Sequence, residues 1–307
     1  LEGAARIGHV GVTGTAAQFP AGLLPDGSDV PEIARSRSFV PGSASVAAIR
    51  DLPFGLQATG SVSISQRPPE AQELFSKGPH EASGTFEIGN PDLGKEQATS
   101  FELGLRRTKG DFRFEASVFH TRYSGFIYKR LTGATCGDDF DSCIAGPGEE
   151  LKQIAFDQKD ARFTGAEVRA QLDVTRIAGG TFGVEGQYDI VRARFTDGTA
   201  VPRLPPQRLG GGAYWTDGAW FARAMLLHAF AQTAVAAEET PTAGYNLLNA
   251  SVSYTHRFAP HEAFRDLTLG LAGTNLLDAD IRNSTSFKKD EVLQPGRSVR
   301  LFATLRF

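Results

Sequence analysis

Apolar and polar residues alternate over ten or more consecutive positions in several stretches of this 307-residue chain. Residues 54–65 and 182–190 place apolar or small side chains at even positions and mostly polar ones at odd positions. Successive side chains of a β-strand point to opposite faces, so a repeat of two residues predicts long strands with one apolar face. The sequence carries no comparable repeat of 3.6 residues, which would indicate an amphipathic helix.

The expected strands are longer than those of ordinary globular sheets. Globular strands average about 5–6 residues, whereas a tilted strand needs about 9–11 residues to cross a bilayer. We expect about twelve strands, near residues 1–12, 42–51, 54–66, 97–108, 111–129, 160–176, 180–196, 206–216, 218–233, 244–258, 266–277 and 296–307.

The connections between these strands alternate in length. Short ones fall at residues 51–53, 109–111, 177–179, 216–218 and 259–265, and longer ones at 13–41, 67–96, 130–159, 197–205, 234–243 and 278–295. Outer-membrane barrels have short periplasmic turns and longer extracellular loops. The predicted fold class is therefore all-β, an antiparallel transmembrane β-barrel, rather than a soluble β-sandwich.

Composition agrees with this fold class. The mean hydropathy of −0.22 and the scarcity of long apolar runs exclude helical spans, but strands with one lipid face and one lumen face average to such a value. The net charge of −3 gives no reason to expect a nucleic-acid partner. The charged faces would line the lumen and pair across strands, through Arg106, Arg113, Glu115, Glu167, Arg169, Asp173, Glu185 and Asp189.

Enzyme motifs are missing from the sequence. Its six histidines form no H-E-x-x-H pattern, and neither G-x-S-x-G nor a P-loop occurs. We therefore assign no catalytic residue and expect no enzymatic activity.

Several segments together resemble the TonB-dependent outer-membrane receptor family. They are residues 66–75, 78–93 and 166–168, Asn275-Leu276-Leu277-Asp278, and Pro295-Gly296-Arg297 followed by the strand that ends at Phe307. The resemblance covers essentially the whole chain and implies a 22-stranded barrel with an N-terminal plug. Counted back from Phe307, residues 1–307 would be the last twelve strands, with the plug and the N-terminal strands absent.

The resemblance also implies a location and partners. It predicts a receptor in the outer membrane of a Gram-negative bacterium, embedded in the lipid bilayer and driven by the TonB–ExbB–ExbD complex through the absent N-terminal region. A C-terminal aromatic residue such as Phe307 resembles the signal read by the barrel-assembly machinery, although it also suits a girdle of interfacial aromatics. The alternatives are a self-contained 12-stranded pore or outer-membrane enzyme, and a secreted β-rich binding module.

The implied function is active uptake of a scarce nutrient. Residues 78–80 and 86–93 resemble the zinc-uptake branch of the family, which makes zinc the first expectation, followed by a ferric siderophore or haem. His80 and Glu81 offer an imidazole and a carboxylate suited to zinc in a long outer loop, unless they are only solvated surface. Such a metal would be cargo, and no resident cofactor is expected.

Two cysteines bracket a short acidic segment. Cys136 and Cys143 are close in sequence and most simply form one disulfide in an exported loop, the alternative being a zinc site. The residues between them include three aspartates that could attract a cation or substrate, or could be solvated surface: Asp138, Asp139 and Asp141.

Overall fold

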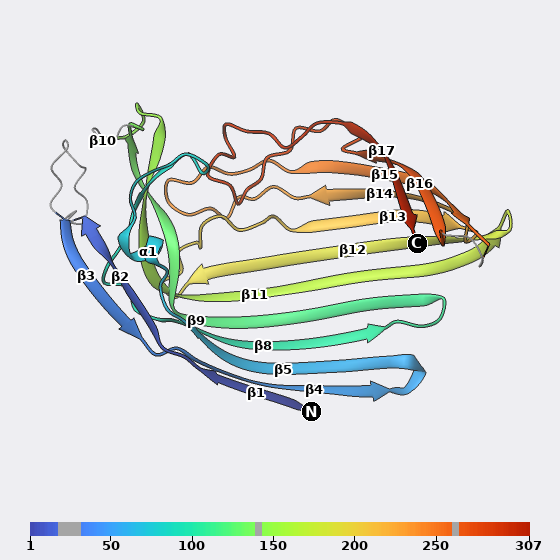
Figure 1. Ribbon diagram of the computed structural model, residues 1–307, viewed down its shortest axis with the longest axis horizontal. Helices are drawn as coiled ribbons and strands as arrows, with labels where there is room; N and C mark the ends of the chain where they lie inside the picture. Colours follow the sequence, from blue (N-terminus) through green and yellow to red (C-terminus); the bar gives the residue numbers. More distant parts are fainter. Residues whose placement is uncertain (18–31, 139–142, 260–263) are drawn as a thin grey trace.

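A computed structural model of the chain describes residues 1–17, 32–138, 143–259 and 264–307. In these residues the regular secondary structure is almost entirely β-strand, arranged as one large curved sheet and a separate two-stranded sheet (Figure 1). No helix in the described ranges has both the length and the apolar character needed to cross a membrane. The predicted all-β, antiparallel architecture is confirmed.

Twelve strands follow one another along the main path of the large sheet, and every neighbouring pair is antiparallel. In order along that path they are β1 (Glu2–Ile7), β4 (Gly42–Leu52), β5 (Leu56–Arg67), β8 (Glu96–Arg107), β9 (Phe112–Cys136), β11 (Leu151–Ile177), β12 (Gly180–Phe195), β13 (Arg208–Thr216), β14 (Trp220–Ala229), β15 (Tyr245–Arg257), β16 (Asp266–Thr274) and β17 (Ser298–Arg306).

The predicted first strand, 1–12, is wrong in its extent. The chain leaves the large sheet after β1, and Val10 begins β2 (Val10–Ala17), which pairs only with β3 (Glu32–Phe39). The predicted 13–41 loop therefore contains most of a hairpin. Likewise the predicted 130–159 loop consists largely of the extended ends of β9 and β11, together with β10 (Cys143–Ala145).

Short and long connections lie at opposite ends of the sheet. The turns β4–β5, β8–β9 and β11–β12 are all at one end, on the right of Figure 1, and the long connections are at the other. The chain thus has a short-turn end and a long-connection end, as the alternation of lengths predicts.

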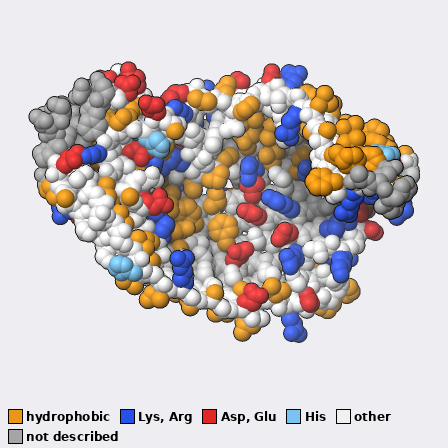
Figure 2. Space-filling view, in the orientation of Figure 1, with side chains coloured by type: hydrophobic (Ala, Val, Ile, Leu, Met, Phe, Trp, Pro, Cys, Tyr) orange, Lys and Arg blue, Asp and Glu red, His pale blue; other side chains and the backbone are white. Residues whose placement is uncertain are grey.

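The two faces of the sheet differ in chemistry. Val118, Ala166 and Ile190 lie directly opposite one another on β9, β11 and β12, in an outward-facing apolar row. Charged side chains gather in the hollow of the sheet (Figure 2). Several of the predicted lumen residues pair there across strands, namely Arg113 with Asp173 (2.6 Å), Asp189 with Arg208 (2.9 Å) and Glu185 with Arg223 (2.5 Å).

The β5–β8 connection folds back onto the extended β9–β11 hairpin. It contains α1 (Ala71–Phe75), β6 (Lys77–His80) and β7 (Thr85–Ile88). The capping box of Glu70 and Glu73 starts α1, and β7 adds to the free edge of β11 as a parallel strand. Packing completes this arrangement through a core of Phe39, Leu74, Leu93, Ile127, Ile154 and Phe156.

Candidate functional site

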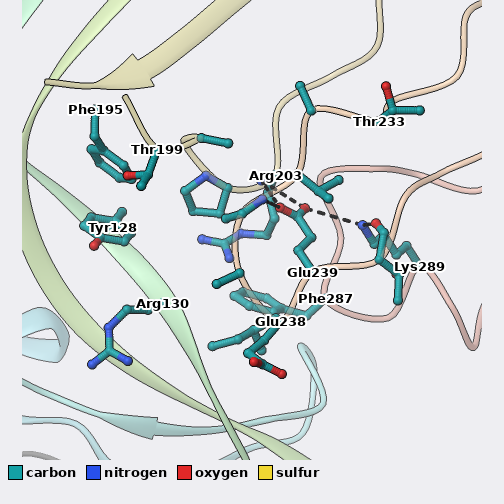
Figure 3. A pocket seen from close by; sticks show the side chains of 18 of the residues that line it. Tyr128, Arg130, Phe195, Thr199, Arg203, Thr233, Glu238, Glu239, Phe287 and Lys289 are labelled. Carbon is teal, nitrogen blue, oxygen red and sulfur yellow. Dashed lines mark hydrogen bonds and ion pairs between the residues drawn. The ribbon is translucent and has the colours of Figure 1, made fainter. Parts of the chain in front are cut away.

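A cavity of about 620 Å³ lies at the long-connection end of the sheet. One wall is formed by Tyr128, Arg130 and Leu131 of β9, together with two lysines of β11. Three connections supply the rest, through residues 194–203, 233–240 and 286–290 (Figure 3). The cavity is therefore built where segments far apart in sequence meet.

Arg203 is the unusual residue of this cavity. Its guanidinium lies over the ring of Phe287, 4.1 Å from the ring centroid, and its Nη2 donates a hydrogen bond to the carbonyl oxygen of Lys129 (2.9 Å). Among the described residues no carboxylate lies within 4.0 Å of the guanidinium. Burial lowers the pKa of Arg203 to about 10, against the opposing effect of Glu239.

The backbone around Arg203 is held by Glu239. The Glu239 carboxylate accepts hydrogen bonds from the backbone N–H of Arg203 (3.1 Å) and of Ala236 (3.1 Å). It also pairs with Lys289 at 3.4 Å, and the side chains of both charged partners are almost completely buried. Arg203 adopts a positive φ of 55°, a strained conformation that such contacts stabilise. The Glu239 carboxylate therefore joins its own β14–β15 connection to the β12–β13 connection, through Arg203, and to the β16–β17 connection, through Lys289.

Most of the other cations of the cavity wall have acidic partners. Lys159 pairs with Asp197 (2.5 Å) and lies 5.2 Å from the ring centroid of Phe195. Arg130 pairs with Asp157 at 3.2 Å. Their charges are thus largely balanced within the protein. Two arginines of the wall have no carboxylate within 4.0 Å among the described residues, Arg194 and Arg203. Arg194 is exposed to solvent, whereas Arg203 is partly buried and therefore has the greater need for an anion.

Aromatic rings supply the apolar part of the wall. Tyr128 lies with its ring centroid 4.6 Å from that of Phe195, within a cluster that also includes Phe126 and Phe163. Of these rings, Tyr128 and Phe195 line the cavity, and with Phe287 they offer flat apolar surface in the same cavity as Arg203 (Figure 3). The arrangement can bind an anion that carries planar or apolar groups.

The structure brings His80 to Glu87 rather than to Glu81. His80 Nδ1 lies 2.9 Å from Glu87 Oε1, and Glu87 also pairs with Lys129. The Thr85 hydroxyl donates a further hydrogen bond to the same carboxylate (3.2 Å). The Glu81 side chain is exposed, while its backbone carbonyl accepts a hydrogen bond from Lys288.

The pKa of Glu87 is set by these neighbours. Burial acts to raise the pKa of this carboxyl, but the hydrogen bonds from Lys129 and His80 outweigh it and hold the pKa below the ordinary value. No group of three or more His, Cys, Asp or Glu side chains in the described part of the chain is placed to hold a metal ion. The geometry around His80 is that of an ion-pair cluster centred on the buried Glu87 carboxylate, with the His80 ring itself exposed.

The remaining predicted site residues are scattered. Asp138 is exposed in the turn after β9, and Asp139 and Asp141 lie outside the described residues. Cys136 and Cys143 form a disulfide that joins β9 to β10, with the Cys136 side chain fully buried. Phe307 follows β17 and is 97% exposed. None of these described residues lines the cavity.

Comparison with known proteins identifies related sequences and folds. The sequence model of a protein family described as TonB dependent receptor-like, beta-barrel matches residues 35–276.

Among solved structures, the copper transporter OprC superposes with a TM-score of 0.67 at 18% identity, covering 88% of this chain and 41% of that one. The siderophore receptor PirA from Acinetobacter baumannii gives 0.55 at 14% identity, covering 99% and 46%. The hemophore receptor HasR of Serratia marcescens, in complex with its hemophore HasA and heme, gives 0.54 at 16% identity, covering 99% and 47%. At these identities the likeness is one of fold, and the chain spans less than half the length of each of these structures.

Proposed function

The chain belongs to the TonB-dependent receptor family, and we propose that it forms part of a receptor that takes up a metal chelate. Members of this family are transporters rather than enzymes, and they work with TonB in the outer membrane of Gram-negative bacteria. In this proposal the twelve strands supply one part of a 22-stranded barrel. A plug domain outside residues 1–307 then couples substrate uptake to TonB–ExbB–ExbD.

The chemistry of the cavity supports an anionic chelate as the substrate. Arg203 offers a partly desolvated guanidinium without a carboxylate partner among the described residues, and the rings of Phe287 and Tyr128 lie beside it. A guanidinium binds carboxylate or phenolate oxygens through charge-assisted hydrogen bonds, while the rings would contact the organic part of a chelate. This single cation is the observation that carries the proposal.

The names of the similar structures agree with this substrate class. They are described as a copper transporter, a siderophore receptor and a hemophore receptor bound to heme, so the neighbouring proteins handle metals or metal complexes. Free zinc is a weaker proposal for this chain, because His80 is engaged with Glu87 and not with Glu81. We therefore expect an anionic chelate as the substrate and include free zinc in the uptake experiment for comparison.

Two parts of the proposal concern assembly. The β17 strand and the terminal Phe307 would be read by the barrel-assembly machinery, and the outward apolar face would contact the bilayer. The long-connection end, which holds the cavity, would then face the outside of the cell, where a substrate arrives.

The test is uptake by cells that lack the native receptor and express full-length variants. Cells would be given radiolabelled ferric catecholate, ferric citrate, heme, free zinc or free copper, with and without a functional TonB. We expect TonB-dependent uptake of an anionic iron complex, with Arg203→Gln raising the half-saturating concentration by at least about tenfold. The control Arg297→Gln removes an exposed arginine that is ion-paired with Asp278.

Three results would overturn the proposal. The first is equal uptake of the anionic complexes by the Arg203 variant and the wild-type receptor. The second is uptake of free zinc or copper alone. The third is uptake that does not require TonB, which would favour a passive pore.

A further inference from the structure

Three arginines stand side by side on neighbouring strands at the long-connection end. Arg122 of β9 is directly opposite Arg162 of β11, and Arg162 is directly opposite Arg194 of β12. All three side chains are exposed. Residues that are directly opposite in antiparallel strands project to the same face, so the three guanidinium groups form one row across the sheet. We call these residues the arginine row.

The arginine row lies on the outward, apolar face. Along β11, residues at every second position from Arg162 are Thr164 and Ala166, and Ala166 belongs to the apolar row that includes Val118 and Ile190. The apolar positions of β11 run from residue 166 to residue 174, a span of nine residues that is close to the length a tilted strand needs to cross a bilayer. The arginine row therefore stands just beyond the apolar band.

The next row toward the band is also partly basic. It places Arg192 of β12 opposite Thr164, and Thr164 opposite His120 of β9. His120 uses its Nδ1 to hydrogen-bond the Thr164 hydroxyl at 2.8 Å. Arg192 is exposed. The positive charge thus extends over two successive rows on three strands.

These charges are not neutralised within the described protein. Like charges directly opposite one another on neighbouring strands destabilise a sheet. None of the arginines on these two rows has a carboxylate within 4.0 Å in the residues that the structure describes. Asp160, two residues before Arg162, uses its carboxylate to accept the backbone N–H of Gly125 (2.8 Å). Arg194 donates only to a backbone carbonyl, that of Gly198 (2.9 Å).

We propose that the arginine row binds the phosphate groups of an anionic lipid in the leaflet at the long-connection end. A planar guanidinium forms paired hydrogen bonds to phosphate oxygens, and several guanidinium groups in a row fit a head group that carries more than one phosphate. The adjoining apolar band offers surface to the acyl chains of the same molecule. The head group would thus bind the arginine row while the acyl chains of the same lipid contact the apolar band. A free phosphate ion has no acyl chains and would make only the first of these contacts.

The inference rests on the proposed placement of the barrel in the outer membrane. The probe is diphosphorylated lipid A, and the matched ligand is the same lipid with both phosphates removed. Full-length receptor in a neutral detergent would be titrated with each lipid, and the bound fraction would be measured by native mass spectrometry. We expect the wild-type receptor to bind the phosphorylated lipid at least about tenfold more tightly.

The variant Arg122→Gln/Arg162→Gln should lose most of this preference. A matched control, Arg50→Gln/Lys109→Gln, removes two exposed cations at the short-turn end and should keep it. Circular dichroism of each variant verifies the fold. If the folded row variant prefers the phosphorylated lipid as strongly as the wild type, the proposal is wrong.

Two further results separate the possible errors. Displacement of the lipid by millimolar inorganic phosphate would overturn the proposal in favour of a site for the free ion. The outer-membrane placement is tested separately, by fractionating the cells. If the placement is wrong, the full-length receptor will be missing from the outer-membrane fraction. In that case the proposed function fails as well, whereas loss of lipid preference alone leaves it intact.

Discussion

The ammonium group of Lys129 and the carboxylate of Glu87 form an ion pair that joins β9 to β7. Glu87 is almost completely buried, and His80 and Thr85 also hydrogen-bond its carboxylate. One carboxylate therefore fastens the β6–β7 hairpin to the extended β9–β11 hairpin.

Replacing that carboxylate should loosen the hairpin. Glu87→Gln leaves Lys129 without its partner, so we expect a local destabilisation of about 1–3 kcal/mol. Hydrogen–deuterium exchange of the β7 amides, which pair with β11 at Lys152–Ala155, measures the effect. Glu81→Gln, at an exposed carboxylate four residues after Lys77, is the control and should leave this exchange unchanged. Equal protection in both variants would contradict the role given to Glu87.

The same carboxylate should make the hairpin sensitive to acid. The pKa of Glu87 is held below its ordinary value of 4.5, so its stabilising contribution is fully present above that value. The contribution is lost as the pH falls through the lower pKa of the folded state. Carboxylates titrate at about pH 3–5, so exchange of the β7 amides should be compared between about pH 6 and pH 3. After correction for intrinsic exchange, it should accelerate more in the wild type than in Glu87→Gln as the pH falls. Identical pH profiles would argue against this linkage.

Gly183 provides the space for a cross-strand aromatic ring. A Cβ atom at this position would lie 2.2 Å from the Tyr214 ring, whose hydroxyl hydrogen-bonds Asp173. Gly183→Ala should therefore displace the ring and lower the free energy of unfolding by about 1–3 kcal/mol. Gly186→Ala, on the same strand, meets only the carbonyl oxygen of Gly210 at 3.7 Å and is the control. Denaturant unfolding of refolded protein in detergent compares the two variants.

Phe287 should contribute to binding through Arg203. Removing the ring in Phe287→Leu abolishes the cation–π contact, which is worth about 0.5–2 kcal/mol, or roughly twofold to thirtyfold in affinity. The half-saturating concentration for uptake of the preferred chelate should rise within that range. Phe264→Leu, at an exposed phenylalanine near the β15–β16 turn, should have no such effect. An unchanged half-saturating concentration in Phe287→Leu would remove Phe287 from the site.

The disulfide should stabilise the tip of the β9–β11 hairpin. Closing the short loop between Cys136 and Cys143 is worth about 2–3 kcal/mol by loop-closure entropy. Both Cys136→Ser and Cys143→Ser lose this contribution, but Cys136→Ser also places a hydroxyl in a fully buried position and should be the more damaging. Limited proteolysis of the hairpin ranks the two variants. The opposite order would show that burial of Cys136 does not govern the cost.

Most of the large sheet could be predicted from the sequence. Alternation between apolar and polar residues is a local signal, and each main-path strand from β4 to β17 overlaps a predicted range, whereas β6, β7 and β10 fall in predicted loops. It located β12 (Gly180–Phe195) to within a residue of the predicted 180–196, because both of its faces keep their character along the whole strand. The signal weakens beyond the apolar band, where both faces of β9 and β11 contact protein or water. Residues 130–136 of β9 and 151–159 of β11 therefore fall in the predicted 130–159 loop.

The candidate site was not predictable in the same way. Arg203, Glu239 and Phe287 come from three different connections, and no periodic pattern marks their segments. His80 could be recognised as a possible ligand, but its partner Glu87 is fixed by the β6–β7 turn and not by adjacency in sequence. The ion pairs of the hollow were partly predictable, because alternation alone decides which charges share the inner face.

The extended β9–β11 hairpin supports several connections at once. The β2–β3 hairpin reaches it through Phe39, the β5–β8 connection through β7, the β12–β13 connection through Arg203, and the β16–β17 connection through Phe287, whose carbonyl accepts a hydrogen bond from Lys152. These outer segments therefore do not vary independently. A homologue that acquired a different substrate by exchanging one of them would have to preserve the hairpin surface that the others use, so changes of specificity in such a receptor should arise as coordinated sets of substitutions.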